Sequence, residues 1–598
     1  MNVRNILKMR NYTIVFLLVC YIVASFVLVN YFDRIIFFET NKEKKNIVEA
    51  VLKPRTDIPT NLILNVDPFL TSSDDPKIRE IRKKLSALVF SSLFIESPNG
   101  DVIGDLVDSF TFNNAQNLEI TLKSNVKWHD GTDLNAKDVK FSFDVLRSLG
   151  NKSLYSAATN GGNLRIDIID DYKLIINLMN DKSDPVKNSS YLHTLTFPIL
   201  PAHLLAENFY SNTYVNIVET SFGSAPIGTG PLRYLKKNTN EVELESFEQY
   251  FRGDVSLNKY IIRLYESVED IMYDYKLKNV DLFIRGDTGK IDSISQSLID
   301  VGFNLRYATI LSRRYVLYFN IGNKTDDVNS FIKSTLLRRG LLSLINRDKL
   351  IERLGVGRQI LGPVDQSSSY FYQDILSKFE YNTEAFIRLV ESLGYRKEND
   401  GFYYKDGKPL FLELTYLEGG DRDVIVDYLI DELSVVGVRV EAVRLSSKKD
   451  IDKKGSAKND FLDTINNRKY QVLLTVVTNY TDYDPFIEWH STNIPAPGLN
   501  LSNYSSKVLD KNLIDIRVSA NAEEKKQAFL NFQKIFFEES PAIYLINPGI
   551  QIFSSNKLFV PQDLTVVDDH YIYFDILNWV QQLSQNETKR IEPVLLDW

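Results

Sequence analysis

The sequence predicts a mixed α/β fold of several domains that follows one N-terminal membrane-spanning helix. Three observations support this prediction. The chain has 598 residues, of which 44% are hydrophobic and 25% charged, so it is long enough for about two to four folded domains. Segments with the alternation typical of strands are interspersed with segments of helical spacing, without an obvious internal repeat. One uncharged apolar run near the N-terminus stands apart from both patterns.

The uncharged run is YTIVFLLVCYIVASFVLVNYF, residues 12–32, which could cross a hydrocarbon core of about 30 Å as a helix. Three basic residues precede it: Arg4, Lys8 and Arg10. By the positive-inside rule, residues 1–11 lie in the cytoplasm and the bulk of the chain lies outside. We therefore expect a single-pass protein of the cell membrane whose bulk is extracytoplasmic.

A cleaved signal peptide and a lipoprotein signal are the alternatives for this run. The run is longer than the apolar region of roughly 7 to 15 residues that is usual for signal peptides. Cys20 could belong to a lipobox, but Val19 stands where a lipobox has Gly, Ala or Ser. Because Cys20 is the only cysteine, the extracytoplasmic part can form neither an intramolecular disulfide nor a thiolate metal site.

Charge is distributed unevenly between the N-terminal segment and the rest of the chain. Residues 1–55 hold 9 Lys and Arg against 4 Asp and Glu, a net charge of +5, and the remainder carries −13. An acidic exterior argues against nucleic acid or anionic lipid as the main partner. Improved solubility is the simpler interpretation of this acidity.

The folded body is expected to begin near Asp57, after a polar stalk at residues 33–56. NLILNVDPFL, residues 61–70, alternates and predicts a strand, and residues 76–94 have helical spacing. NLEITLKSNVKW, residues 117–128, predicts a second strand. Further strands are predicted within 172–179, 409–417 and 437–445, and further helices at Thr383 to Leu393 and Val424 to Val436.

The segment NVKWHDGTDLNAKDVKFSFDVL, residues 125–146, contains a turn and a helix start. Asp130-Gly131 is a turn signal, and Asn135 stands three residues before Asp138, the spacing of a capped helix N-terminus. One face of the following helix is apolar, with Val139, Phe143 and Leu146. His129 is expected to be structural, because the chain has only 5 His and none other lies close in sequence. We therefore interpret this segment as scaffolding and assign Trp128 to packing.

This segment also resembles the signature segment of the bacterial extracellular solute-binding proteins of family 5, the oligopeptide- and dipeptide-binding group that delivers ligands to ABC importers. Other segments resemble the family in the same order along the chain, from about residue 57 to about residue 590. They are APIGTGPLRY (225–234), the segment 317–354 with its paired arginines, AFIRLVESLGY (385–395), LFLELTYLEG (410–419), YLIDELSVVGVRVE (428–441), TDYDPFIEW (481–489) and ESPAIYL (539–545).

The resemblance implies a two-lobed periplasmic-binding-protein-like fold of type II, in the three-domain cluster. The lobes would be joined by crossing strands and would close over a ligand. The implied divisions are 57–89 (lobe I, first part), 90–222 (inserted domain of lobe I), 223–323 (lobe I, second part), 324–544 (lobe II) and 545–598 (lobe I, C-terminal part).

The resemblance also suggests ligand-binding residues. In peptide-binding members an aspartate of the Asp-Pro segment holds the α-amino group of the peptide. Alignment on Asp484-Pro485 places Thr481 at that position, with Asp482 one residue on, which leaves other polar or cationic solutes open. Asp482 and Asp484 could instead only form the turn. Tyr155 stands near the place where peptide-binding members present an aromatic side chain, and three further aromatic residues flank matched segments: Tyr480, Trp489 and Tyr544.

Sequence signals for an enzyme are weak. The chain has no G-x-S-x-G or H-E-x-x-H motif and no glycine-rich phosphate loop. We expect no catalytic residue, metal ligand or cofactor, and a monomer whose partners are a peptide or small polar solute and the permease subunits of an ABC importer. The alternatives are a membrane-anchored ectoenzyme, such as a peptide or peptidoglycan hydrolase, and a sensory binding module without an importer.

Overall fold

The computed structural model describes residues 45–572 with several gaps. The gaps are 55–57, 59, 71–75, 97–101, 115–116, 154, 156–157, 160–163, 179–187, 212–216, 254, 256, 287–288, 290, 323–329, 367, 375–380, 447–449, 452–456, 459, 479–483, 497, 520–521 and 567–571. The predicted membrane span at 12–32 and the residues before it lie outside the described part. Within 45–572, apart from those gaps, no helix combines the length and the apolar character that crossing a membrane requires.

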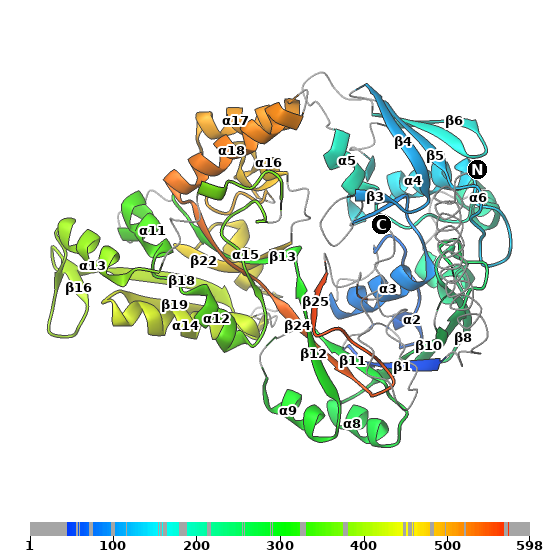
Figure 1. Cartoon of the computed structure of the whole chain (residues 1–598), viewed down its shortest axis with the longest axis horizontal. Coiled ribbons are helices and arrows are strands. Elements are labelled where there is room, and N and C mark those ends of the chain that lie inside the picture. Colours follow the sequence, from blue (N-terminus) through cyan, green and yellow to red (C-terminus); the bar gives the residue numbers. More distant parts are fainter. Residues whose placement is uncertain are drawn as a thin grey trace, which may run out of the picture. The chain divides into compact units, whose positions relative to one another are not determined.

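The first sheet has eight strands drawn from distant parts of the chain (Figure 1). Its order is β25 (Asp563–Val566), β12 (Asn304–Ile310), β24 (Gly549–Ser554), β11 (Leu282–Arg285), β1 (Lys45–Leu52), β10 (Leu257–Tyr265), β9 (Glu241–Ser246) and β8 (Leu232–Lys237). Strand β1 pairs in parallel with β11, in a range for which the sequence predicted a stalk. The folded body therefore begins upstream of Asp57.

A buried ion pair explains why β1 looked like a polar stalk. The Glu49 carboxylate is fully buried, yet it accepts a hydrogen bond of 2.7 Å from Lys84 Nζ and another of 2.7 Å from the hydroxyl of Tyr260. Buried charges are tolerated where they are paired and hydrogen-bonded in this way. A charged residue in a sequence therefore does not always mark an exposed segment.

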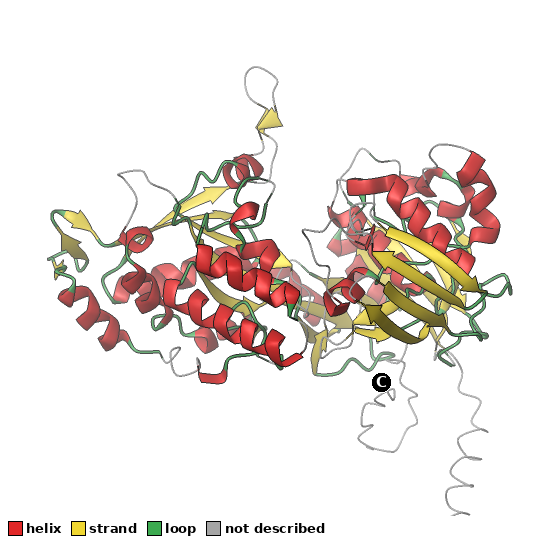
Figure 2. Ribbon diagram, turned by 90° about the horizontal axis from the view of Figure 1, so that it is seen from above, coloured by secondary structure: helices red, strands yellow, loops and turns green. Residues whose placement is uncertain are grey.

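The second sheet has six strands and a hydrophobic core on each face. Along its β13, Tyr315, Leu317 and Phe319 belong to one core, and the alternate residues Val316 and Tyr318 belong to the other, as the two-residue period of a strand requires. Helices flank its strands (Figure 2). The order is β14 (Arg358–Gln359), β23 (Ala542–Asn547), β13 (Arg313–Phe319), β22 (Val472–Thr478), β18 (Phe411–Leu417) and β19 (Arg439–Leu445).

A third, antiparallel sheet lies within residues 90–222. Its order is β4 (Val107–Asn114), β5 (Asn117–Leu122), β7 (Lys173–Leu178) and β6 (Leu164–Asp170). The small sheets are β2 (Phe94–Glu96) with β3 (Val102–Gly104), β15 (Arg396–Lys397) with β16 (Tyr403–Lys405) and β17 (Lys408–Pro409), and β20 (Asp450–Ile451) with β21 (Ala457–Lys458).

The helices occur between these strands along the chain. The α-helices are α2 (Thr60–Ile63), α3 (Pro76–Val89), α4 (Ala136–Leu149), α5 (Asn188–Thr194), α6 (Ala202–Ser211), α7 (Ser221–Ser224), α8 (Val268–Lys276), α9 (Ser293–Asp300), α10 (Ser330–Lys333), α11 (Thr335–Leu342), α12 (Arg347–Leu354), α13 (Thr383–Ser392), α14 (Asp421–Val435), α15 (Asp460–Asn466), α16 (Pro485–Trp489), α17 (Lys507–Val518) and α18 (Ala522–Glu539).

Most elements predicted from periodicity are confirmed, and one is wrong. Helices α3, α13 and α14 and strands β5, β7, β18 and β19 lie where the sequence predicted them. The predicted strand at 61–70 is instead the end of α2 followed by turns. Its apolar residues are buried against the first core from an irregular backbone, so alternation there did not indicate a strand.

The capped helix predicted after residue 134 is α4. The side chain of Asn135 accepts a hydrogen bond from the backbone of Lys137, and the Asp138 carboxylate accepts one of 2.9 Å from the backbone N–H of Asn135. Asp138 also accepts the indole N–H of the fully buried Trp128 at 3.3 Å. Trp128 therefore packs in the core, and this segment positions α4.

His129 is the centre of a second set of contacts, here called the His129 network. Its Nδ1 accepts the backbone N–H of Gly228 at 3.2 Å, and Nε2 lies 3.0 Å from the carbonyl of Gly230. Since Nδ1 accepts, the proton is on Nε2, which donates to that carbonyl. Burial lowers the pKa of His129 to about 4, so the ring is neutral near pH 7.

The two glycines of the His129 network lie directly against the end of α3. A Cβ on Gly228 would come 1.9 Å from the carbonyl oxygen of Val89, and a Cβ on Gly230 would come 2.6 Å from the carbonyl carbon of the same residue. The N–H of Gly230 donates to the Val89 carbonyl at 2.9 Å. Only glycine permits this approach, so the G-T-G motif joins α3 to the His129 segment.

The chain passes between the first and second sheets at two places. Strand β12 leads into β13 through Leu311 and Ser312, and β23 leads into β24 through Pro548. The side-chain amide of Asn547 links the two crossings, because it donates to the carbonyls of Leu311 at 2.9 Å and Arg313 at 2.8 Å. The division of the chain into two lobes near residues 323 and 544 stays a prediction.

Candidate ligand-binding site

A cavity of about 440 Å³ lies beside the two strand crossings and is here called the crossing cavity. Its lining comes from both sheets and from the loops that follow β11 and β18. The lining residues are Gly286, Arg313, Tyr315, Gly419, Gly420, Asp421, Arg422, Val476, Pro548, Gly549 and Ile550. This volume lies in the range typical of small-molecule sites, and it is large enough to hold part of a short peptide.

A two-glycine turn brings α14 to the crossing cavity. Gly419 and Gly420 have φ values of 108° and 58°, which are left-handed conformations that favour glycine. They reverse the chain between β18 and α14, so that Asp421 stands in the first turn of the helix. There an acidic side chain interacts favourably with the helix dipole.

Asp421 connects the two sheets at this cavity. It is 4% exposed, and its carboxylate accepts the backbone N–H of Gly289, in the loop after β11, at 3.0 Å. Arg422 donates from Nε to the carbonyl of Leu417 at 2.7 Å, which holds the arginine beside the end of β18. Both charge signs are thus fixed at one end of the cavity.

The remaining lining adds a second cation and an aromatic hydroxyl. Arg313 and Tyr315 are alternate residues at the start of β13. Burial, with Asp421 nearby, raises the pKa of Tyr315, so its hydroxyl stays protonated. The crossing cavity therefore offers cationic groups, one carboxylate and a hydroxyl beside apolar Val476 and Ile550, which suits a polar ligand that carries both charges.

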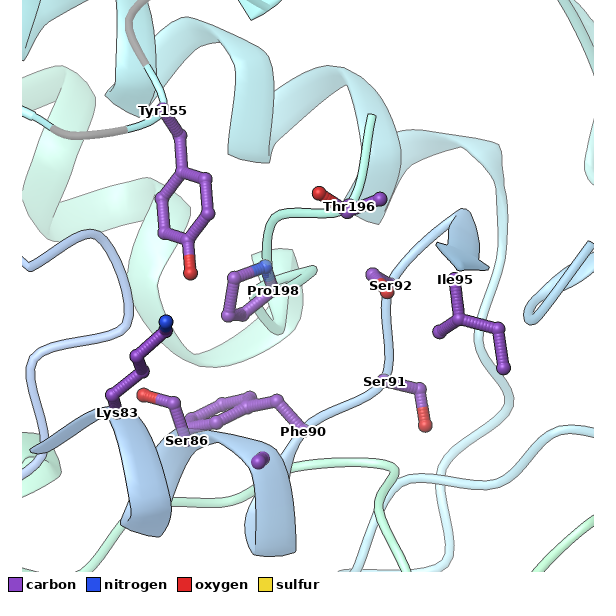
Figure 3. A pocket seen from close by; sticks show the side chains of 10 residues that line it. Lys83, Ser86, Phe90, Ser91, Ser92, Ile95, Tyr155, Thr196 and Pro198 are labelled. Atoms are coloured by element: carbon purple, nitrogen blue, oxygen red, sulfur yellow. The ribbon is translucent and has the colours of Figure 1, made fainter. Parts of the chain in front are cut away.

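Tyr155 lines a different, smaller cavity of about 40 Å³, here called the Tyr155 cavity (Figure 3). The other lining residues are Lys83, Ser86, Ala87, Phe90, Ser91, Ser92, Ile95, Thr196 and Pro198. The last turn of α3 and the residues after it form one wall, and Tyr155 faces them. Of the residues that the sequence proposed for ligand binding, Tyr155 is the one that lines a cavity described here.

The Asp-Pro segment is only partly described. Tyr480, Thr481 and Asp482 lie outside the described residues, so their assignment to the ligand stays a prediction. Asp484 caps α16 by accepting the backbone N–H of Phe486 at 3.1 Å, and it pairs with Arg517 at 2.6 Å. These contacts give Asp484 a structural role in the helix start.

Trp489 and Tyr544 both lie in the core of the second sheet. Trp489 is fully buried and stacks on Tyr318 with ring centroids 5.8 Å apart. Tyr544 is 1% exposed, and its hydroxyl donates to Glu488 at 3.2 Å. Packing accounts for both residues, and contact with a ligand stays a prediction for them.

Sequence reasoning did not identify most of the residues that line the two cavities. The Gly419-Gly420 pair before a helix was a usable signal, because two adjacent glycines mark a sharp turn. Lys83 and Ser86 gave no signal, since on an amphipathic helix they look like ordinary exposed residues. Among the residues described in 45–572, no three His, Cys, Asp or Glu side chains gather in a group that could hold a metal ion.

Comparisons with known proteins identify what the chain is similar to. Residues 101–496 match the family model described as bacterial extracellular solute-binding proteins, family 5 Middle. The oligopeptide-binding protein AppA of Bacillus subtilis is 23% identical over 458 residues, which cover 75% of this chain and 77% of AppA.

Solved structures show the same fold at low sequence identity. NikZ from Campylobacter jejuni, in complex with Ni(L-His), matches with a TM-score of 0.61 and 21% identity, over 90% of this chain and 100% of NikZ. AppA from Bacillus subtilis, in complex with a nonapeptide, matches with a TM-score of 0.58 and 18% identity, again over 90% and 100%.

Proposed function

This chain belongs to the bacterial extracellular solute-binding proteins of family 5, and from that premise we propose that it captures short peptides or similar polar oligomers for an ABC importer. A relative named as an oligopeptide-binding protein, which aligns with three quarters of the chain, supports the peptide as ligand. Import itself would be carried out by separate permease and ATPase chains.

The crossing cavity is the observation that carries this proposal. It is lined from both sheets beside the two strand crossings, where rotation about a few residues would change the distance between its walls. A ligand that contacts both walls stabilises the closed arrangement by its differential affinity for it. We assign residues 45–311 and 549–572 to the first lobe, with 90–222 as its inserted domain, and residues 313–547 to the second.

We also propose that residues 12–32 anchor the protein in the cell membrane, with the lobes outside. The uncharged sequence and the preceding basic residues support this anchor. A tethered binding protein would deliver its ligand to an importer in the same membrane. Mass spectrometry of the N-terminus of the mature protein checks this part, because cleavage after the apolar run would contradict it.

Native mass spectrometry of the full chain in mild detergent, with released molecules identified by fragmentation, tests the ligand class. We expect a set of co-purified short peptides. Alanine peptides from the tripeptide to the nonapeptide are then titrated by calorimetry, beside a nickel and histidine mixture, because one similar structure contains Ni(L-His). Binding of that mixture without any peptide would contradict the proposal, and peptide cleavage would favour the ectoenzyme alternative.

A pair of variants locates the site. Val476→Trp places a large side chain in the lining of the crossing cavity and should weaken peptide binding by about tenfold or more. Val443→Trp is the matched control, because Val443 is 40% exposed on the outer strand β19 of the same sheet. Equal affinities of the two variants, with unchanged thermal stability, would show that the peptide binds elsewhere.

A further inference from the structure

We propose that Val356 is a pivot on which the two proposed lobes turn during closure. This inference rests on the proposed function and adds to it a contact that the moving lobes keep. Val356 lies between α12 and β14, on the side of the second sheet, and its side chain contacts Gly289 and Gly549 on the side of the first sheet. These two contacts are here called the Val356 pivot.

Two glycines flank Val356 and fix its turn to the second sheet. Gly355 ends α12 with a φ of 79°, and Gly357 has a φ of 143°, values that favour glycine. The N–H of Gly355 donates to the carbonyl of Ile351 at 2.8 Å. A Cβ on Gly357 would come 3.0 Å from the carbonyl oxygen of Asn547, so the turn also packs against one strand crossing.

The surface that receives Val356 also consists of two glycines. A Cβ on Gly289 would lie 2.3 Å from Cγ1 of Val356, and a Cβ on Gly549 would lie 2.4 Å from both of its methyl groups. Gly549 begins β24 directly after the crossing at Pro548, whereas Gly289 lies in the loop after β11. One side chain therefore contacts the first sheet both at a crossing and away from it.

Hydrogen bonds hold Gly289 from both sides. Its carbonyl accepts the side-chain amide of Gln551, in β24, at 3.3 Å, and Gln551 in turn accepts the hydroxyl of Ser295 at 2.9 Å. The N–H of Gly289 donates to Asp421, at the start of α14, at 3.0 Å. Gln551 and Ser295 are fully buried. Gly289 is thus fixed to the first sheet and bonded to the second.

A contact away from the crossings restricts how the lobes can move. The two crossings lie side by side, because the N–H of Ile310 donates to the carbonyl of Pro548 at 3.0 Å. Strands that cross at one place permit twisting as well as bending. A second fixed place, at Gly289, leaves rotation about the line that joins the two places. Close packing favours such a fixed contact, because packed surfaces resist continuous deformation.

A reversible cross-link tests the pivot. A Cβ on Gly289 would lie 3.7 Å from the Cβ of Val356, inside the range of about 3.5 to 4.5 Å that disulfides span. The full chain in mild detergent, with Gly289→Cys, Val356→Cys and Cys20→Ala, carries only the engineered pair of cysteines. We expect its oxidised and reduced forms to bind alanine peptides, from the tripeptide to the nonapeptide, with affinities within about twofold of each other in calorimetry.

A loss of affinity of about tenfold or more on oxidation, reversed by dithiothreitol, would show that the contact separates during closure. That result would overturn the pivot. Failure of the two cysteines to oxidise would overturn it as well, because the two residues would then not stay in contact.

A measurement without peptide separates this inference from the proposed function. Small-angle neutron scattering, with the detergent contrast-matched, compares the oxidised and reduced forms, and we expect superimposable curves. A change in the radius of gyration on oxidation would overturn the pivot, whether or not a peptide binds. Superimposable curves together with no peptide binding by the wild type would overturn the proposed function alone.

A pair of alanine variants provides a second test that needs no disulfide. Gly289→Ala adds a Cβ that meets Cγ1 of Val356, so it should displace the turn and lower peptide affinity by about fivefold or more. Adding Val356→Ala to this variant removes Cγ1 and leaves the two Cβ atoms 3.7 Å apart, in ordinary contact. The double variant should regain affinity to within about twofold of the wild type. An equal loss in both variants would contradict the pivot.

Discussion

The last turn of α3 borders two regions that differ in whether their buried polar atoms are hydrogen-bonded. On the Val89 side is the His129 network, in which both ring nitrogens of His129 are hydrogen-bonded and two glycines allow the backbones to meet. On the Ser86 side is the Tyr155 cavity, where a buried hydroxyl has no partner within the described chain.

The two regions differ in how far their buried polar atoms are hydrogen-bonded, and residue type does not show this difference. The His129 segment contains the residues that look most like a catalytic site, a histidine beside an aspartate and a tryptophan, yet its contacts are complete within the protein. The Tyr155 cavity contains a lysine, serines and a tyrosine, which attract little notice in a sequence. Completed hydrogen bonds give stability, whereas a buried hydroxyl without a partner, such as that of Ser86, costs free energy.

The strongest test of this difference is Gly228→Ala. Its Cβ would lie 1.9 Å from the Val89 carbonyl oxygen, a backbone atom that can move only with α3. We expect the free energy of unfolding to fall by about 3 kcal/mol or more, while the folded fraction keeps its peptide affinity. Urea unfolding measures the free energy of unfolding, and calorimetry measures the peptide affinity. Gly286→Ala is the stability control, since its Cβ would meet nothing closer than 3.9 Å.

The second-largest effect is expected for the pH dependence of stability that protonation of His129 causes. The neutral form is favoured in the folded protein, where burial lowers the pKa to about 4, and unfolding returns the pKa to about 6.5. The unfolded state therefore binds more protons between these values, and this contribution to stability, roughly 3 kcal/mol, is complete above about pH 6.5 and is lost as the pH falls toward 4.

His129→Gln isolates that contribution. The variant lacks the titrating ring, so its unfolding free energy should fall less steeply than that of the wild type between pH 6.5 and pH 4.5. Urea unfolding at several pH values provides the two slopes. Parallel slopes would show that His129 takes up no extra proton on unfolding.

A smaller effect is expected for Asn135→Ala at the start of α4. This change removes the side-chain oxygen that accepts the N–H of Lys137 and should lower stability by about 0.5 to 2 kcal/mol. Peptide affinity of the folded fraction should be nearly unchanged. A large loss of affinity without a loss of stability would instead give the 125–146 segment a role in ligand binding.

The smallest change in stability is expected for Ser86→Ala. The substitution deletes a buried hydroxyl that has no described partner, so stability should be unchanged or slightly higher, within about 1 kcal/mol. A clear loss of stability in thermal unfolding would mean that Ser86 belongs to the scaffold, like His129.

Periodicity predicted the parts of the fold in which one face is buried and the other exposed. Strand β5 shows strict alternation of half-buried and buried residues, and the capped start of α4 follows from two polar residues. The same reasoning failed for β1, because the buried Glu49 is neutralised by Lys84, far away in sequence. It also failed for 61–70, where apolar residues reach the core from turns.

The candidate site was less predictable, because a cavity arises from residues that meet only in the folded chain. Tyr155 was proposed by resemblance and does line a cavity, but Lys83 and Ser86 opposite it lie on the polar side of a helix. Nothing local marks Ser86, since its missing hydrogen bond is a property of its surroundings. The residue Thr481, on which ligand class depends in the resemblance, lies outside the described residues.

The two strand crossings also have a consequence for the order in which the protein can be assembled during synthesis. All six strands of the second sheet come from the continuous stretch 313–547, whereas β24, which lies between β12 and β11 in the first sheet, begins only at Gly549. A nascent chain that has grown as far as Asn547 already contains every strand of the second sheet. At that moment its first sheet still lacks β24, which joins β12 to the other strands, and also β25.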